Sequence, residues 1–219
     1  MKDIFLNHER TIYSIKFLED TKGTIEIGRL TTIFKKDNNI EVVNETIIYP
    51  QNIKENTLVY LSKLDFRPLR YESYITTPYK DITIKGEYHK KNVIATISTT
   101  QETKKIRIDI TNDNTYDNAS AFYIFRLIAC GILPIKRLYL INLNIGQKIL
   151  IEVEPIEETV KCMFGEIDCL GVRMRLCEHS QSPAQKFFYR KESPNYLIKN
   201  IAGRQVLEIE QIGDVDGSH

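Results

Sequence analysis

Arg126 is the residue best placed, by type and position, to do chemistry. It is the one charged residue in an apolar stretch over residues 119–130. Burying an unpaired guanidinium is costly, so Arg126 requires an oxygen partner. One candidate is the carboxylate or phosphate headgroup of a ligand, which the planar guanidinium suits. The other is internal, an Asp or Glu side chain or loop carbonyls such as those of residues 112–118, and internal ion pairs are the commoner arrangement.

The other polar residues of the sequence give little indication of a catalytic site. The four histidines have no Ser, Cys or carboxylate at a spacing typical of a catalytic set; they are His8, His89, His179 and His219. The sequence also contains no H-E-x-x-H, G-x-S-x-G or phosphate-binding glycine motif. We therefore rank an enzyme third among the functional hypotheses, since distant strands can still assemble catalytic groups, and we expect no cofactor.

Asp109, Asp113 and Asp117 superficially resemble a calcium-binding loop. Counted from Asp109, the sixth position is Asn114 rather than Gly and the twelfth is Ser120 rather than Glu, which does not fit an EF-hand. We interpret the segment as a turn followed by a helix cap, and we expect no metal site.

The four cysteines are too few for a disulfide scaffold and include no C-x-x-C pair. Two of them, Cys162 and Cys169, flank an expected hairpin turn. Alternation of apolar residues on both strands predicts an odd-numbered loop over residues 164–166. That register places Cys162 inward and Cys169 outward, and it predicts no disulfide between them.

Composition excludes several classes of protein. The 219 residues carry 30 Lys and Arg against 29 Asp and Glu, a balance that argues against nucleic-acid binding by bulk charge. A small basic stripe of Arg173, Arg175 and Lys161 fits a solvated face with nearby glutamates. We expect no nucleic-acid partner.

No stretch of the sequence reaches the length of a membrane span. The longest apolar candidate, over residues 119–133, is interrupted by Arg126 and Gly131. The apolar run near the N-terminus, residues 4–6, is too short for a signal peptide. We therefore expect a soluble, cytoplasmic protein, or an exported one if a leader has been removed.

Period-2 alternation of apolar and polar residues dominates the chain and predicts antiparallel strands. Residues 52–63 fit either a helix or a strand, and the run over 57–61 favours the strand. The other expected strands cover residues 11–18, 24–34, 40–49, 69–76, 82–88, 93–99, 106–111, 147–153, 158–164, 167–177, 186–190 and 205–210.

One segment predicts a helix. Polar residues 112–118 offer N-caps, residues 119–130 form an apolar body, and Gly131 and Pro134 follow as stop signals. Because the helix is apolar nearly all round, it should be buried on more than one side. We predict an α+β, mostly β fold, a curved antiparallel meander (half-barrel) around one helix near residues 118–130. It forms a single domain over 1–212, with a tail over 213–219.

Three short segments carry a resemblance to a known type of domain. They are LDFRPLR at residues 64–70, the helix entry YDNASAFYIFR at 116–126, and the hairpin over 158–169. This order of elements resembles a bacterial domain of unknown function akin to the lipoprotein-localisation half-barrels, whose members usually look exported. The resemblance implies a curved sheet that holds acyl chains.

Two functional hypotheses follow. The first is a non-catalytic protein that binds an apolar or amphipathic, lipid-like small molecule in the concavity, with Phe122, Phe125 and Tyr116 as wall and Arg126 as anchor. The second is a structural or assembly module that binds another protein, or a second copy of itself, through a sheet edge or face.

Overall fold

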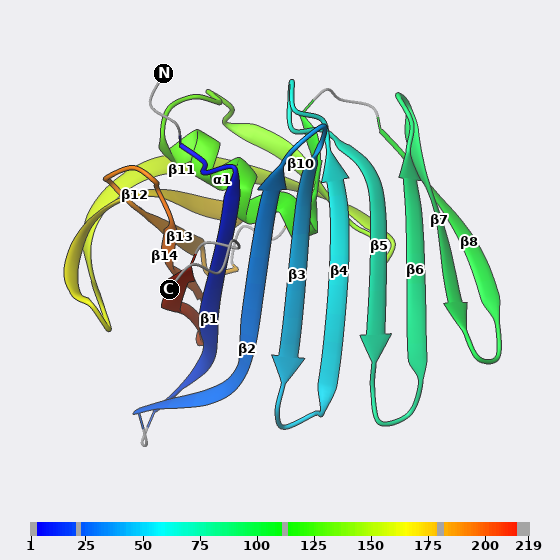
Figure 1. Cartoon of the computed structure of the whole chain (residues 1–219), viewed down its shortest axis with the longest axis horizontal. Helices are drawn as coiled ribbons and strands as arrows, with labels where there is room; N and C mark the ends of the chain where they lie inside the picture. Colours follow the sequence, from blue (N-terminus) through cyan, green and yellow to red (C-terminus); the bar gives the residue numbers. More distant parts are fainter. Residues whose placement is uncertain (1–3, 21–22, 111–113, 179–181, 214–219) are drawn as a thin grey trace.

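A single sheet and one helix make up this computed structural model. It describes residues 4–20, 23–110, 114–178 and 182–213. Fifteen strands form the sheet, and Figure 1 shows the sheet bending around the helix α1 without closing into a barrel. The expected mostly β architecture, a curved antiparallel sheet around one helix, is therefore confirmed.

The strands follow the chain in two groups, before and after the helix. The first group is β1 (His8–Glu19), β2 (Gly23–Lys36), β3 (Ile40–Ile48), β4 (Ile53–Leu61), β5 (Pro68–Thr76), β6 (Asp81–Tyr88), β7 (Asn92–Thr99), β8 (Thr103–Asp109) and β9 (Thr115–Asp117). The second group is β10 (Arg137–Asn142), β11 (Gln147–Cys162), β12 (Gly165–Leu176), β13 (Gln185–Arg190), β14 (Leu197–Ala202) and β15 (Gln205–Gly213).

Strand order in the sheet follows the sequence almost everywhere. The order is β8-β7-β6-β5-β4-β3-β2-β1-β15-β14-β13-β12-β11-β10-β9, so the first and last strands pair in its middle. Neighbours are antiparallel, with the exception of β9 and β10, which are parallel. Since one sheet runs through both groups, we keep the proposal of a single domain over residues 1–212; residues 214–219 lie outside the described part of the chain.

Residues 53–61 form a strand, as the sequence favoured, but three strands were missed and one was divided. The missed strands are β9, β10 and β14. The sequence suggests two strands over residues 147–153 and 158–164, whereas β11 is continuous through Pro155. Because β10 pairs with β11 only as far as Glu152, Pro155 lies where β11 has a partner on one side, and proline is tolerated there.

The β11–β12 hairpin corrects the expected register. Cys162 pairs with Gly165, which leaves a two-residue turn at residues 163–164 in place of an odd-numbered loop. Cys169 is 2% exposed, so its outward placement is wrong. Along β12 the buried position is the odd-numbered Cys169 near the turn, but the even-numbered Val172 farther along the strand. A long hairpin twists, so one face of it meets the core near the turn and the opposite face meets the core farther away. Both cysteines are free.

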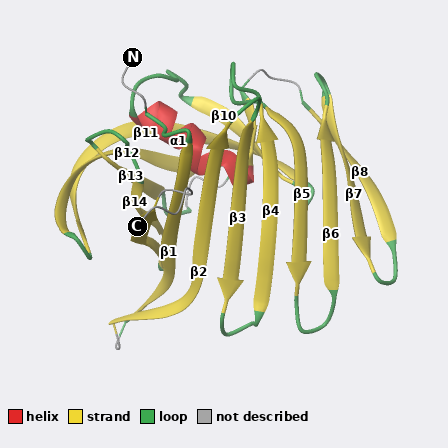
Figure 2. Ribbon diagram, in the orientation of Figure 1, coloured by secondary structure: helices red, strands yellow, loops and turns green. Residues whose placement is uncertain are grey.

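The expected helix over 119–130 is confirmed as a short 3-10 helix, η1 (Asn118–Ser120), continued by α1 (Ala121–Ala129). The Asp117 carboxylate caps η1 by accepting a hydrogen bond from the Ala119 backbone N–H at 2.8 Å. Figure 2 shows α1 lying across the curved sheet. One face of α1, with Phe125, packs into a core formed by β1, β2 and β9–β15, and the other, with Tyr123, packs into a core formed mainly by β2–β7.

The turn between β10 and β11 reaches back to the first group of strands. Leu143 in this turn is 1% exposed and belongs to the core formed by β2–β7. It lies against Gly86 of β6, where a Cβ atom would come within 2.5 Å of the Leu143 Cδ1 atom. The Tyr71 hydroxyl donates to Asn144 Oδ1 at 2.6 Å. The β10–β11 turn thus contacts β5 and β6, and these contacts stabilise the curvature of the open sheet.

Candidate functional site

A cavity of about 490 Å³ lies between the helix and the concave side of the sheet. The helix contributes Ala121, Phe122 and Phe125 to its lining. The strands contribute mainly apolar side chains from β1, β2 and β10–β15, of which Ile15 and Leu207 are examples. The lining is therefore built from both groups of strands, and the sheet must curve for the cavity to exist.

Strand register explains the first part of this wall. Ile15 pairs with Leu207, Leu207 with Asn200, and Asn200 with Phe187. Residues directly opposite each other in antiparallel strands point to the same face. The Phe187 ring then meets the helix, with its centroid 4.6 Å from that of Phe125.

A second row of paired residues extends the wall. Ala202 pairs with Gln205 on one side and with Gln185 on the other. All three residues line the cavity. The small side chain of Ala202 between two longer amides leaves part of the space open.

Charges on these strands point away from the cavity. Among the described residues, the lining includes no Asp, Glu, Lys, Arg or His. Neighbouring charged residues pair elsewhere: Lys16 Nζ lies 2.6 Å from Glu208 Oε2, and Lys186 Nζ lies 2.7 Å from Glu158 Oε1. Because side chains alternate along a strand, the apolar inner residues and the outer ion pairs occupy opposite faces.

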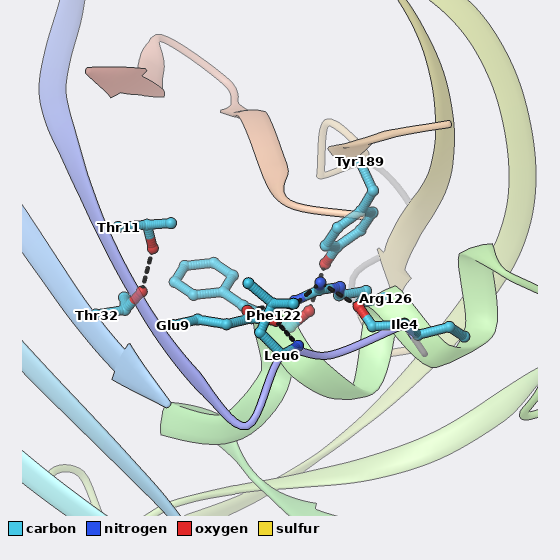
Figure 3. A network of polar contacts seen from close by, with 8 residues as sticks. All are labelled: Ile4, Leu6, Glu9, Thr11, Thr32, Phe122, Arg126 and Tyr189. Atoms are coloured by element: carbon cyan, nitrogen blue, oxygen red, sulfur yellow. Dashed lines mark hydrogen bonds and ion pairs between the residues drawn. The ribbon is translucent and has the colours of Figure 1, made fainter. Parts of the chain in front are cut away.

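Arg126 has an internal partner, which is Glu9 of β1. The Arg126 Nη1 atom donates to Glu9 Oε2 at 2.7 Å, and Nη2 donates to Glu9 Oε1 at 3.2 Å. Nη2 also donates to the Ile4 carbonyl, and the Leu6 backbone N–H donates to Glu9 Oε1 at 2.7 Å. Figure 3 shows this network joining α1 to the segment before β1. Both charged side chains are nearly fully buried, at 3% and 4% exposure.

Aromatic rings complete the surroundings of the guanidinium. The Arg126 Cζ atom lies 4.4 Å from the Phe5 ring centroid and 5.6 Å from that of Tyr196, distances typical of cation–π contacts. The Nε atom of Arg126 is buried without a hydrogen-bond partner among the described residues. Arg126 therefore links α1 to the N-terminal segment through its hydrogen bonds to Glu9 and Ile4. It does not belong to the lining of the cavity.

Buried tyrosines surround the same pair. The Tyr189 hydroxyl donates to the Phe122 carbonyl at 2.7 Å and so fixes the start of α1 against β13. Burial raises the pKa of Tyr13 to about 12, and it raises the pKa of Tyr189 well above its usual range. Both hydroxyls therefore stay protonated at neutral pH, and that of Tyr189 acts as a hydrogen-bond donor.

Asp117 forms a second buried polar site, at the start of the helix. Its side chain is buried at 1% exposure and accepts hydrogen bonds from the Tyr88 hydroxyl and the Ala119 N–H. Burial raises the pKa of Asp117 to about 7, although both hydrogen bonds act to lower it. The described residues provide no cation partner for this carboxylate in an ion pair.

The four expected site residues thus divide into two pairs. Phe122 and Phe125 line the cavity, whereas Arg126 and Tyr116 lie outside its lining. Tyr116, on β9, is 4% exposed and packs in the core. The inward amides of β13–β15 were missed. Their strands alternate, but the alternation alone does not tell which face is concave.

Other polar candidates do not gather into a site. Asp109 is exposed and pairs with Arg107 at 3.1 Å, and Asp113 lies outside the described residues, as do His179 and His219. Within the described ranges, no group of three or more His, Cys, Asp or Glu side chains could hold a metal ion. No helix in that part of the chain has the length and apolar character needed to cross a membrane.

Comparisons with known proteins agree with this architecture. The chain matches the model of a family described as "Protein of unknown function (DUF3108)" over residues 12–218. No curated protein matches it. It is similar to a solved beta-barrel-like protein of domain of unknown function DUF1849 from Brucella abortus, with a TM-score of 0.60 and 10% identity, over 96% of this chain and 99% of that one.

At 10% identity this likeness concerns the fold alone. The expected resemblance to a domain of unknown function with a barrel-like fold is confirmed. Since the family model spans nearly all of the sequence, the chain belongs to the DUF3108 family of proteins of unknown function.

Proposed function

We propose that this protein binds an apolar or amphipathic small molecule in the cavity between α1 and the concave side of the sheet, without a catalytic role. The observation that carries the proposal is the cavity itself, with a volume of about 490 Å³. This volume falls within the range of roughly 300–1,000 Å³ typical of small-molecule sites. Its mostly apolar lining, with a few amides and a hydroxyl, also has the composition of such sites.

Phe122 and Phe125 are the proposed contacts on the helix. The Phe122 ring lies 6.1 Å and the Phe125 ring 4.6 Å from the Phe187 ring, centroid to centroid. The Tyr189 hydrogen bond to the Phe122 carbonyl holds this wall in place. A ligand would therefore meet a preformed aromatic surface, which lowers the ordering cost of binding.

Binding to another protein through the sheet edge is the weaker alternative. The edge strand β8 carries Lys104, Lys105 and Arg107, and charged residues on an edge strand disfavour pairing with a second strand. At the other edge, β9 has three residues, all of them buried. These features support the small-molecule proposal over edge-to-edge association.

Filling the cavity tests the proposal. Titration with Nile red, a neutral apolar dye, is expected to give a saturable blue-shifted fluorescence with one dye per chain. Ala202→Ile adds apolar volume between Gln185 and Gln205, so the affinity for the dye should fall roughly ten-fold or more. Native mass spectrometry of the purified protein gives a second readout, a retained mass of lipid size.

The matched control is Ala184→Ile, which adds the same side chain just before β13 and outside the cavity lining. The control should bind Nile red as the wild type does. Equal dye binding by the wild type and Ala202→Ile, with both folded by circular dichroism, would refute the proposed site. A defined oligomer without any retained small molecule would favour the assembly alternative.

A further inference from the structure

We infer that the ligand of this cavity carries an uncharged polar head, such as a hydroxyl, ester or amide, rather than a carboxylate, phosphate or ammonium group. The inference rests on the proposed function and specifies the chemical class of the ligand. It contrasts with the anionic headgroup that Arg126 suggests from the sequence.

The lining supplies the first argument. Its polar side chains are all neutral, and they combine donors with acceptors; they are Thr46, Asn118, Gln185, Asn200 and Gln205. Amides and hydroxyls can donate hydrogen bonds to an ester head, and they can both donate to and accept from a hydroxyl head. A charged head placed among them would lose its hydration without gaining an opposite charge, which is strongly unfavourable.

The second argument concerns two cations that are next to lining residues in the sequence, Arg126 and Lys186, both of which are already paired. Arg126 is held by both oxygens of Glu9. Lys186, next to the lining residues Gln185 and Phe187, lies 2.7 Å from Glu158. Recruiting either cation to a ligand would strip a carboxylate of its partner.

The third argument compares the cavity with three other hollows of the described surface. Each of them is lined by charged side chains; for example, Arg190 and Asp168 line the hollow beside the β11–β12 turn, and Lys90 and Arg107 line the one beside the β6–β7 turn. Against a background of 27% charged residues, a lining without charge on nine strands and a helix marks a site for a neutral molecule.

Displacement of Nile red by amphiphiles with saturated tails of nearly equal length tests the inference. The probes are 1-monolauroylglycerol, laurate and dodecyltrimethylammonium, each below its critical micelle concentration at pH 8. The neutral glyceride should displace the dye at concentrations roughly ten-fold or more below those of either ion, because only the ions pay for burying a charge.

A single substitution should reverse this preference. Gln185→Arg places a guanidinium in the lining, which suits a carboxylate, so the affinity for laurate should rise at least several-fold while that for dodecyltrimethylammonium falls. Gln211→Arg is the control, since Gln211 lies on β15, is exposed and does not line the cavity. The control should keep the wild-type order.

The outcomes separate the two proposals. If Nile red does not bind saturably, the proposed function itself fails. If the dye binds but laurate or the ammonium probe displaces it as well as the glyceride does, or if none of the three displaces it, the neutral-head inference is overturned and the cavity remains a binding site. Equal gains in laurate affinity from Gln185→Arg and Gln211→Arg would also count against the lining as the source of selectivity.

Discussion

Glu9→Gln should lower the free energy of unfolding by about 3–5 kcal/mol, the loss expected when one partner of a buried ion pair is removed. The substitution keeps the shape of the side chain but leaves the Arg126 guanidinium, at 3% exposure, without its counter-charge. It also weakens the acceptor for the Leu6 N–H. Urea denaturation at neutral pH measures the change.

Two further variants make this prediction specific. Glu152→Gln removes one partner of an exposed pair, in which the Arg137 and Glu152 side chains are 69% and 49% exposed, and it should cost about 1 kcal/mol or less. The double variant Glu9→Leu with Arg126→Met replaces the buried pair by apolar side chains and should regain much of the lost stability. A loss in Glu9→Gln no larger than that in Glu152→Gln would contradict the role assigned to the pair.

The local pattern of apolar and polar residues was sufficient to predict most helices and strands, but not which face of each strand is buried. The alternating strands of β1–β8 and the helix with its Gly131 stop follow from residue type and spacing. The twist of the β11–β12 hairpin does not, because burial of Cys169 depends on which face of a twisted strand meets the core. The division of β11 into two expected strands was wrong for a similar reason, since a strand can continue through Pro155 only because β10 ends before it.

The candidate site was predictable only in part. Burial of Arg126 and its need for a partner follow from the apolar run around it, but its partner Glu9 lies 117 residues away in the sequence. The two phenylalanines were identified because they belong to the one apolar helix. The amides Gln185 and Gln205 come from strands that approach the helix only when β1 pairs with β15, so no local signal marks them.

Asp117 should make the protein less stable as the pH rises from about 4 to about 7. Burial raises its pKa in the folded state to about 7, against a value of 3.8 for an ordinary Asp. Between these values the folded state keeps a proton that the unfolded state releases, so the stabilisation is complete below about pH 4 and is lost through pH 7. The difference between these two pKa values corresponds to about 4 kcal/mol of unfolding free energy.

Asp117→Asn should remove this part of the pH dependence, since the amide does not titrate and can still accept the Ala119 N–H that caps the helix. The facing groups, Tyr88 and Tyr71, have pKa values raised above 10 by burial and stay neutral over the same range. Urea denaturation from pH 4 to pH 8 should give a flatter profile of unfolding free energy against pH for Asp117→Asn than for the wild type.

Asp20→Asn, at an exposed ion pair with Arg204, is the control and should follow the wild type. Parallel profiles for the wild type and Asp117→Asn would mean that the buried carboxyl does not titrate in this range. The charge of Asp117 would then not affect the stability of the helix that carries Phe122.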